Sequence, residues 1–166
     1  MSYSEPVYLG EAGEASATIR SVDHEPDVVY PNGARLHFLA TGQLTRGLYG
    51  LYRMEMGSEP SGPTPHFHRT FTESFYVLSG AIRIYNGREW VDSQPGDFIH
   101  VPEGGIHGFR NESGKPASLL IHFSPGAPRE KYFEGSARYA RDGRGSDDEM
   151  AEFYSLHDNV WLEENR

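Results

Sequence analysis

Short runs of alternating apolar and polar residues fill the middle of the chain, and turn-forming residues separate them. An alternation of period two sends successive side chains to opposite faces of a strand. Glycine (19 residues) and proline (11 residues) recur between the runs, which indicates short antiparallel connections. The pattern predicts an all-β sandwich or barrel with strands at residues 35–40, 48–56, 75–78, 81–85, 88–91, 97–101, 108–111 and 118–123.

The best-defined strand pair is a hairpin around Asn86-Gly87. Residues 82–85 and 88–91 flank this dipeptide, and both of its members tolerate a positive φ. We therefore predict a tight two-residue turn.

Two helices are expected after the last strand. Pro128 suits a first helical position before residues 129–134, and Gly135 marks a stop or an interruption. Ser146 and Glu149 have the spacing of a capping box that opens a second helix, and the polar residues 141–145 form a flexible link. One face of the second helix carries Met150, Phe153, Tyr154 and His157.

The length of 166 residues predicts one domain, because a single core of this size buries most of its apolar surface. The hydrophobic fraction is only 37%, but 13% of the residues are aromatic and bury large areas. We divide the chain into an N-terminal arm (1–33), a barrel (34–126) and a C-terminal helical extension (127–166) that packs on the barrel or on a partner.

The charge balance disfavours polyanionic partners. Lys and Arg number 15 against 24 Asp and Glu, a net charge of −9, and no basic run interrupts this balance, so neither nucleic acid nor an anionic membrane is expected to bind. Cysteine is absent, which excludes thiolate chemistry, disulfides and Cys-based metal sites. No basic segment followed by an apolar stretch opens the chain, and we expect a cytoplasmic protein.

A cluster of potential metal ligands lies between the predicted strands. His66 and His68 are two residues apart, so on an extended backbone both imidazoles share one face. Glu73 follows closely, and His107 returns 39 residues after His68. An isolated His-x-His pair is more often a surface or hydrogen-bonded feature than a metal site. The surroundings therefore decide the interpretation.

The surroundings match two sequence motifs. Gly62, Pro63 and Pro65 precede the histidine pair, and Gly80 follows Glu73; a second block contains Gly96, Pro102, Gly104, His107 and Asn111. These blocks resemble the two motifs of the cupin superfamily, antiparallel jelly-roll barrels whose metal ligands are His, His, Glu and His. The resemblance spans about residues 34–126. It departs at Pro60, where the family has a glycine, and Gly62 is the nearest substitute.

The resemblance implies metal-ligand roles for His66, His68, Glu73 and His107. Such ligands suit one divalent transition metal ion, Fe, Ni, Mn, Co, Cu or Zn, and four protein ligands leave two positions open around an octahedral ion. Glu73, the single carboxylate, is also the candidate catalytic base. Strand alternation places Phe75 and Phe109 on the site's face as substrate-pocket candidates. Packing in the barrel core is the alternative for both and the commoner role of such aromatic residues. Tyr52, Met54 and Met56 are expected in the core.

Three functions remain open. The segment 33–42 is similar to single-domain cupins related to quercetin dioxygenases, which implies an oxygen-dependent dioxygenase acting on a flavonol-like or enolic aromatic small molecule. A redox-neutral polyketide cyclase or isomerase would use the same ligands. A non-catalytic small-molecule binding cupin is the third alternative. Cupin relatives commonly form dimers, so a homodimer is expected.

Overall fold

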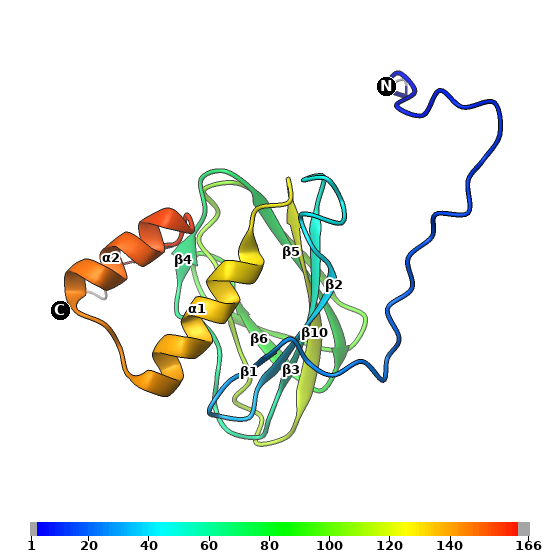
Figure 1. Cartoon of the computed structure of the whole chain (residues 1–166). Helices are drawn as coiled ribbons and strands as arrows, with labels where there is room; N and C mark the ends of the chain where they lie inside the picture. The colour runs from blue at the N-terminus through cyan, green and yellow to red at the C-terminus, as the bar shows by residue number, and fades with distance from the viewer. Residues whose placement is uncertain (1–2, 163–166) are drawn as a thin grey trace.

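The computed structural model describes residues 3–162 of the chain. Its largest sheet has six strands in the order β1-β2-β3-β10-β5-β8 (Figure 1). These strands are Val28–Val29, Arg35–Ala40, Gly50–Met56, Ala117–Ser124, Thr72–Ser79 and Phe98–Val101. All of its pairings are antiparallel, and each of the eight predicted strands is present, which confirms the all-β architecture.

A second sheet of three strands faces the first. Its order is β7-β6-β9, comprising Trp90–Ser93, Ile82–Tyr85 and Gly108–Arg110. Burial alternates strictly along β3 and β10, as expected for strands with one face towards a core. Leu119, Ile121 and Phe123 of β10 are at most 1% exposed. The barrel core thus lies between the two sheets.

The hairpin between β6 and β7 has a longer loop than predicted. Tyr85 pairs with Trp90, so the loop has four residues rather than two. The side chain of Asn86 accepts hydrogen bonds from the backbone amides of Arg88 and Glu89. The Asn86 amide also donates to the Glu89 carbonyl at 3.1 Å, so side-chain and backbone contacts of Asn86 together close the longer turn.

Two helices, α1 (Arg129–Asp142) and α2 (Asp147–Leu156), follow the barrel. The predicted capping box at Ser146 is present, but the expectation of a helix stop at Gly135 is wrong. A Cβ atom at Gly135 would lie 2.5 Å from the Phe153 ring, so this glycine serves close packing between the helices. Arg141 and Asp142 accordingly belong to α1 and not to the link.

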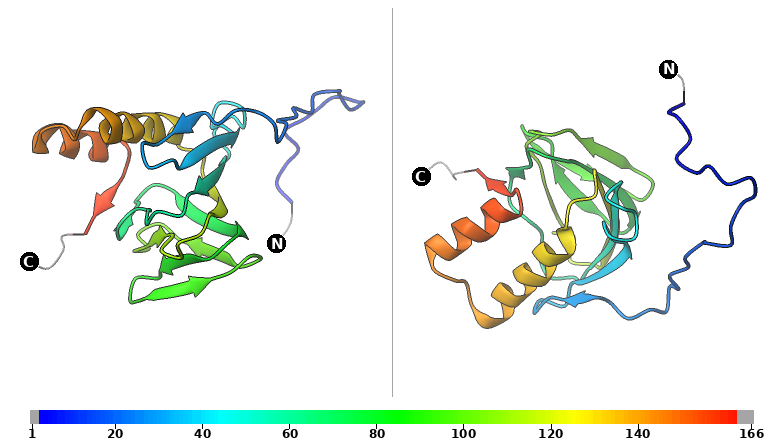
Figure 2. Two further views of the ribbon diagram at one scale, coloured as in Figure 1. Left: turned by 90° about the horizontal axis from the view of Figure 1, so that it is seen from below. Right: turned by 45° about the horizontal axis from the view of Figure 1, so that its top comes forward.

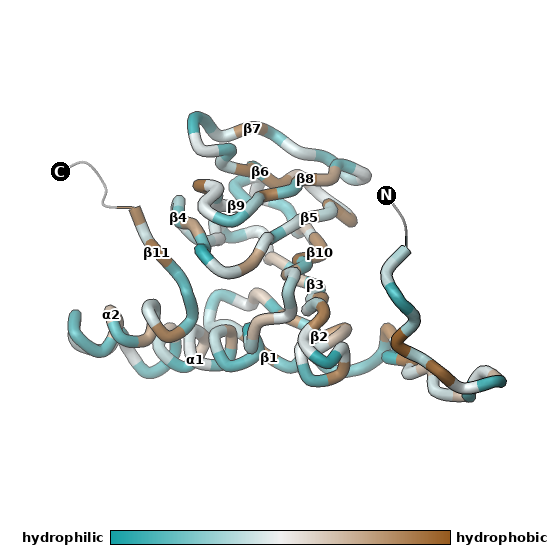
Figure 3. Tube along the Cα trace, turned by 90° about the horizontal axis from the view of Figure 1, so that it is seen from above, coloured by the Kyte–Doolittle hydropathy of each residue, from teal (hydrophilic) through white to brown (hydrophobic). Residues whose placement is uncertain are grey.

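The helices lie along one side of the barrel, next to β1 and β2 (Figures 2 and 3). Phe153 of α2 stacks on Tyr132 of α1, with ring centroids 5.6 Å apart, and Met150 is 4% exposed. The apolar face of α2 therefore packs against its own chain. Among residues 3–162, no helix combines the length and apolar character that a membrane span requires.

After α2 the chain returns to the barrel. Strand β11 (Val160–Trp161) leaves the helical layer and pairs with β4 (His66–Phe67), a two-residue contact that periodicity does not predict (Figure 3). The Asp158 carboxylate accepts hydrogen bonds from the backbone amides of Arg69 and Thr70. The C-terminal extension is thereby fixed beside the histidine pair.

The N-terminal segment runs away from the barrel until β1 begins at Val28 (Figure 1). Val28 is buried and pairs with Leu36 of β2. The arm before it exposes the side chains of Tyr3, Val7, Leu9, Ile19 and Val22.

Candidate metal centre

Four side chains from separate parts of the barrel converge on one point. His66 begins β4, His68 follows it, Glu73 lies in β5, and His107 precedes β9. One potential ligand atom from each lies within 4.8 Å of all the others. All four residues are at most 4% exposed. Burial of a carboxylate and three imidazoles is costly unless they pair or bind a metal.

Backbone contacts fix this convergence. The amide of His66 donates to the carbonyl of His107, and the amide of His107 donates back to His66, both at 2.8 Å. Gly104 donates to the His68 carbonyl at 2.7 Å. The loop before β9 is thus held against β4, so His107 lies beside the pair from the first motif.

The departure at the motif glycine has a structural explanation. Gly62 has a φ of +134°, and a Cβ atom there would overlap the Phe109 carbonyl oxygen. The entry loop needs a residue without a side chain at this position. Gly62 meets that need two residues later than the family pattern places it.

The three histidines have the same tautomer. Each Nδ1 atom donates to a backbone carbonyl oxygen: His66 to Thr64 at 2.8 Å, His68 to Asp158 at 2.6 Å, and His107 to Gly105 at 2.9 Å. A carbonyl only accepts, so each Nδ1 carries a proton and each Nε2 offers its lone pair in the neutral ring. Such backbone acceptors orient metal-binding imidazoles.

Glu73 lies among these Nε2 atoms. Its Oε2 atom is 2.8 Å from His107 Nε2 and 3.0 Å from His68 Nε2. Burial alone would raise the pKa of Glu73, but His107 and His68 outweigh it and lower that pKa. Burial opposes protonation of His107, yet the Glu73 carboxylate raises the pKa of His107 overall. Without a metal, Glu73 and His107 therefore stabilise each other's charged form.

His66 behaves differently. Burial, followed by the neighbouring His107, lowers the pKa of His66 to about 3. A neutral imidazole with a free Nε2 lone pair is the form that binds a metal. Three imidazoles and one carboxylate fit a divalent transition metal ion, whose charge would compensate the buried carboxylate. The residues present thus form a possible metal site.

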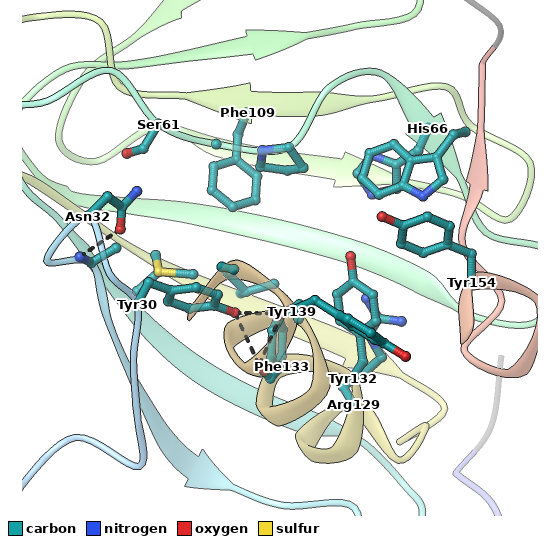
Figure 4. A pocket seen from close by; sticks show the side chains of 18 of the residues that line it. Tyr30, Asn32, Ser61, His66, Phe109, Arg129, Tyr132, Phe133, Tyr139 and Tyr154 are labelled. Carbon is teal, nitrogen blue, oxygen red and sulfur yellow. Dashed lines mark hydrogen bonds between the residues drawn. The ribbon is translucent and has the colours of Figure 1, made fainter. Parts of the chain in front are cut away.

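The cluster opens onto a cavity of about 430 Å³. His66 and Glu73 contribute to its wall, with Phe109 and Phe123 from the barrel (Figure 4). The C-terminal extension contributes the lining residues Arg129, Tyr132, Phe133, Tyr139, Met150, Phe153, Tyr154 and Trp161. The Trp161 ring lies beside His66, with ring centroids 4.8 Å apart. A concave, mostly apolar cavity with a few polar groups is typical of a small-molecule site.

The two aromatic pocket candidates lie at different depths. Phe109 lines the cavity. Phe75 packs behind it, with its ring centroid 5.3 Å from that of Phe109 and 6.0 Å from that of His107. Met54 and Met56, which we expected in the core, are buried and also line the cavity.

The sequence reasoning missed the contribution of the C-terminal extension. Helical periodicity identified an apolar face on α2, but it does not tell which surface that face covers. The wall residues of α1 and β11, above all Arg129 and Trp161, gave no separate signal. A lone arginine at a helix start usually indicates a solvent-exposed side chain, yet Arg129 is 3% exposed.

The sequence and the fold match known proteins. The family model described as a cupin domain matches residues 51–123. Quercetin 2,3-dioxygenase of Bacillus subtilis is 29% identical over 122 residues, 64% of this chain and 36% of that protein. An uncharacterized protein of Streptomyces coelicolor is 33% identical over 94 residues, 57% of this chain and 82% of that protein. The chain spans about a third to a half of the first curated relatives it matches.

The fold comparison agrees. The polyketide cyclase RemF from Streptomyces resistomycificus superimposes with a TM-score of 0.55 and 21% identity, covering 66% of this chain and 79% of that one. The region of the family match contains His66, His68, Glu73 and His107. With the matching motifs, barrel and buried cluster, the chain belongs to the cupin superfamily.

Proposed function

We propose that this cupin is a metal-dependent dioxygenase that acts on a flavonol-like or other enolic aromatic substrate. The observation that carries the proposal is the buried cluster of three histidines and Glu73 at the wall of an aromatic-lined cavity. We assign His66, His68, Glu73 and His107 as ligands of one divalent transition metal ion. The ion would stabilise a substrate enolate or phenolate and, if redox-active, support reaction with O₂.

Glu73 is proposed to act as a base as well as a ligand. It is the only carboxylate in the cluster, and it contributes to the cavity wall. Its carboxylate is ionised at neutral pH, so it can accept the proton of a substrate hydroxyl that enters beside it. Deprotonation would produce the electron-rich oxygen that dioxygenation of an enolic ring requires.

The cavity suits a planar aromatic molecule. Its volume of about 430 Å³ falls within the range of roughly 300–1,000 Å³ found for small-molecule pockets. Phe109 and Phe123 offer ring surfaces for stacking. A dioxygenase places both atoms of O₂ in its substrate and needs no external reductant, which accords with a site made of side chains and one metal.

The similarity to quercetin 2,3-dioxygenase supports this substrate class. The redox-neutral alternative, a polyketide cyclase or isomerase, would use the same base and metal without consuming O₂. A binding protein would retain the small molecule unchanged. The three functions differ in what happens to O₂ and to the ligand.

A measurement of oxygen uptake distinguishes the dioxygenase, the cyclase or isomerase, and the binding protein. Protein as purified, with its metal content measured, is mixed with a panel of flavonols and polyketide-type enols while dissolved O₂ and substrate absorbance are recorded. The proposal expects one O₂ consumed per substrate cleaved, and no uptake by a His107→Ala variant. Substrate conversion without O₂ uptake would support the cyclase or isomerase instead. Binding without conversion of any compound would leave only the binding function.

A further inference from the structure

Within the described part of the chain, Arg129 is a buried cation without an anionic partner. It is the first residue of α1, 3% exposed, and it lines the cavity (Figure 4). Among residues 3–162, its guanidinium forms no ion pair with a carboxylate. The neighbouring Glu130 is occupied elsewhere, since its carboxylate accepts hydrogen bonds from Tyr52 Oη and the Gly42 amide.

The contacts that Arg129 does make are with neutral groups. Its Nη1 atom donates to the His157 carbonyl at 2.8 Å and to Asn159 Oδ1 at 2.9 Å. The guanidinium carbon lies 4.0 Å from the Tyr132 ring centroid. Within the described part of the chain, its Nε atom is buried and has no hydrogen-bond partner. A buried cation with an unused donor is energetically costly until an anion meets it.

A second unused donor lies in the same cavity wall. Trp161 lines the cavity, and its Nε1 atom is also buried without a partner among residues 3–162. Both Arg129 Nε and Trp161 Nε1 are donors only. Both donors belong to residues that line the same cavity, which favours a ligand with acceptor oxygens.

Arg129 is also close to the candidate metal centre. The Phe71 ring lies 4.4 Å from the His68 ring and 5.3 Å from the Arg129 guanidinium carbon. Phe123 likewise contacts both, at 6.4 Å and 5.0 Å. One layer of aromatic rings thus separates the guanidinium from the histidine cluster. A divalent ion held by one carboxylate keeps a net positive charge, so the cavity would present two cationic points.

We propose that Arg129 binds a carboxylate of the substrate, so that the site takes an aromatic or enolic acid with its hydroxyl towards the histidine cluster. This inference rests on the proposed function, because it assumes that the substrate occupies this cavity. It narrows the substrate class to acids. A guanidinium suits this task because its planar array of N–H groups matches a carboxylate.

The test compares 4-hydroxybenzoate with its neutral analogue 4-hydroxybenzamide by titration calorimetry at pH 7.5. Each is titrated into the full chain as purified and after removal of metal with a chelator. Charge-assisted hydrogen bonds favour the carboxylate by about 10- to 100-fold. The inference expects at least a tenfold preference in both protein forms. A preference that vanishes on chelation would assign the carboxylate to the metal and overturn it, as would failure of the carboxylate to bind.

Variants separate binding from a purely structural role. Arg129→Met should abolish the preference, whereas Arg138→Met, which removes a charge from the exposed face of the same helix, should keep it. Asn159→Asp is the more stringent variant, because it supplies Arg129 Nη1 with an internal carboxylate. It should fold stably yet lose the tenfold preference. A stable Asn159→Asp protein that still prefers the carboxylate would overturn the inference.

The result is independent of turnover. A carboxylate preference that depends on Arg129, in a protein that consumes no O₂ with any substrate, would keep the inference and remove the dioxygenase function. Oxygen uptake with neutral flavonols, in a protein without a carboxylate preference, would keep the dioxygenase function and overturn the inference about Arg129.

Discussion

Replacement of Glu73 by glutamine separates metal binding from proton transfer. The substitution keeps the size of the side chain and one oxygen atom, but it removes the negative charge. In the metal-free protein, Glu73 Oε2 receives two contacts from imidazole Nε2 atoms, at 2.8 Å and 3.0 Å. With Glu73→Gln the carboxylate that raises the pKa of His107 is lost, and the amide can donate a hydrogen bond to a neutral Nε2 atom instead. The fold should therefore survive.

The structure sets the size of the effect on stability. The charge-assisted hydrogen bond between His107 and Glu73 becomes a neutral one and loses about 1 kcal/mol. For a domain of this size, that corresponds to a fall of about 2–4 °C in the melting temperature of the metal-free protein. A neutral amide oxygen is a weaker ligand than a carboxylate, so metal occupancy should fall without vanishing.

Turnover should fall further than occupancy. An amide cannot accept the substrate proton at neutral pH, and a positioned base contributes about 10²- to 10⁴-fold to the rate. The quantity to measure is turnover per bound metal, on whichever substrate the wild-type protein converts. Glu55→Gln, which removes the same charge from a half-exposed position on β3, is the matched control and should be unaffected. Wild-type turnover per metal in Glu73→Gln would refute the base role.

Three further predictions concern packing, pH and assembly. Gly135→Ala should destabilise the protein by about 1–2 kcal/mol in urea unfolding despite alanine's helix propensity, because the added Cβ would lie 2.5 Å from Phe153; a more stable variant would contradict this packing. As the pH is lowered from about 6.5 to 3, His66 becomes protonated in the unfolded chain but stays neutral in the folded, metal-free protein, where its pKa is about 3. The free energy of unfolding should therefore decrease as the pH decreases, by at most about 1.4 kcal/mol per pH unit for this group. Urea melts at pH 6.5 and pH 5 should show this slope reduced in His66→Gln, and an unchanged slope would disprove it. We also propose a homodimer through the exposed apolar arm, and light scattering should give twice the chain mass of 18.6 kDa; a monomer mass across a wide concentration range would exclude it.

Local patterns were sufficient to predict the eight longer strands, and the resemblance to the cupin motifs supplied the candidate ligands. Alternation of apolar and polar residues marks β3 and β10 because each has one face in the core. The spacing of His66 and His68 places both rings on one side of an extended segment. The resemblance of the two motifs to those of the cupin superfamily implies a barrel that brings Glu73 and His107 beside them. These features depend on sequence neighbours or on a family motif.

The remaining features depend on contacts between distant residues. Gly135 reads as a helix stop until Phe153 is seen packed against it. Strand β11 has only two residues, too few for any periodicity, and its pairing with β4 is decided by the path of α1 and α2. The buried position of Arg129 follows from that same path, so no local pattern signals that the C-terminal extension lines the cavity.

Metal content tests the central claim most directly. The protein is purified without added metals, and the bound ions are counted by mass spectrometry for the wild type and for His107→Ala. The account predicts close to one divalent transition metal ion per wild-type chain, and a large loss in a His107→Ala protein whose barrel remains folded, because buried apolar side chains supply most of its stability. A folded wild-type protein that neither contains nor takes up a transition metal would contradict it, as would full occupancy in His107→Ala.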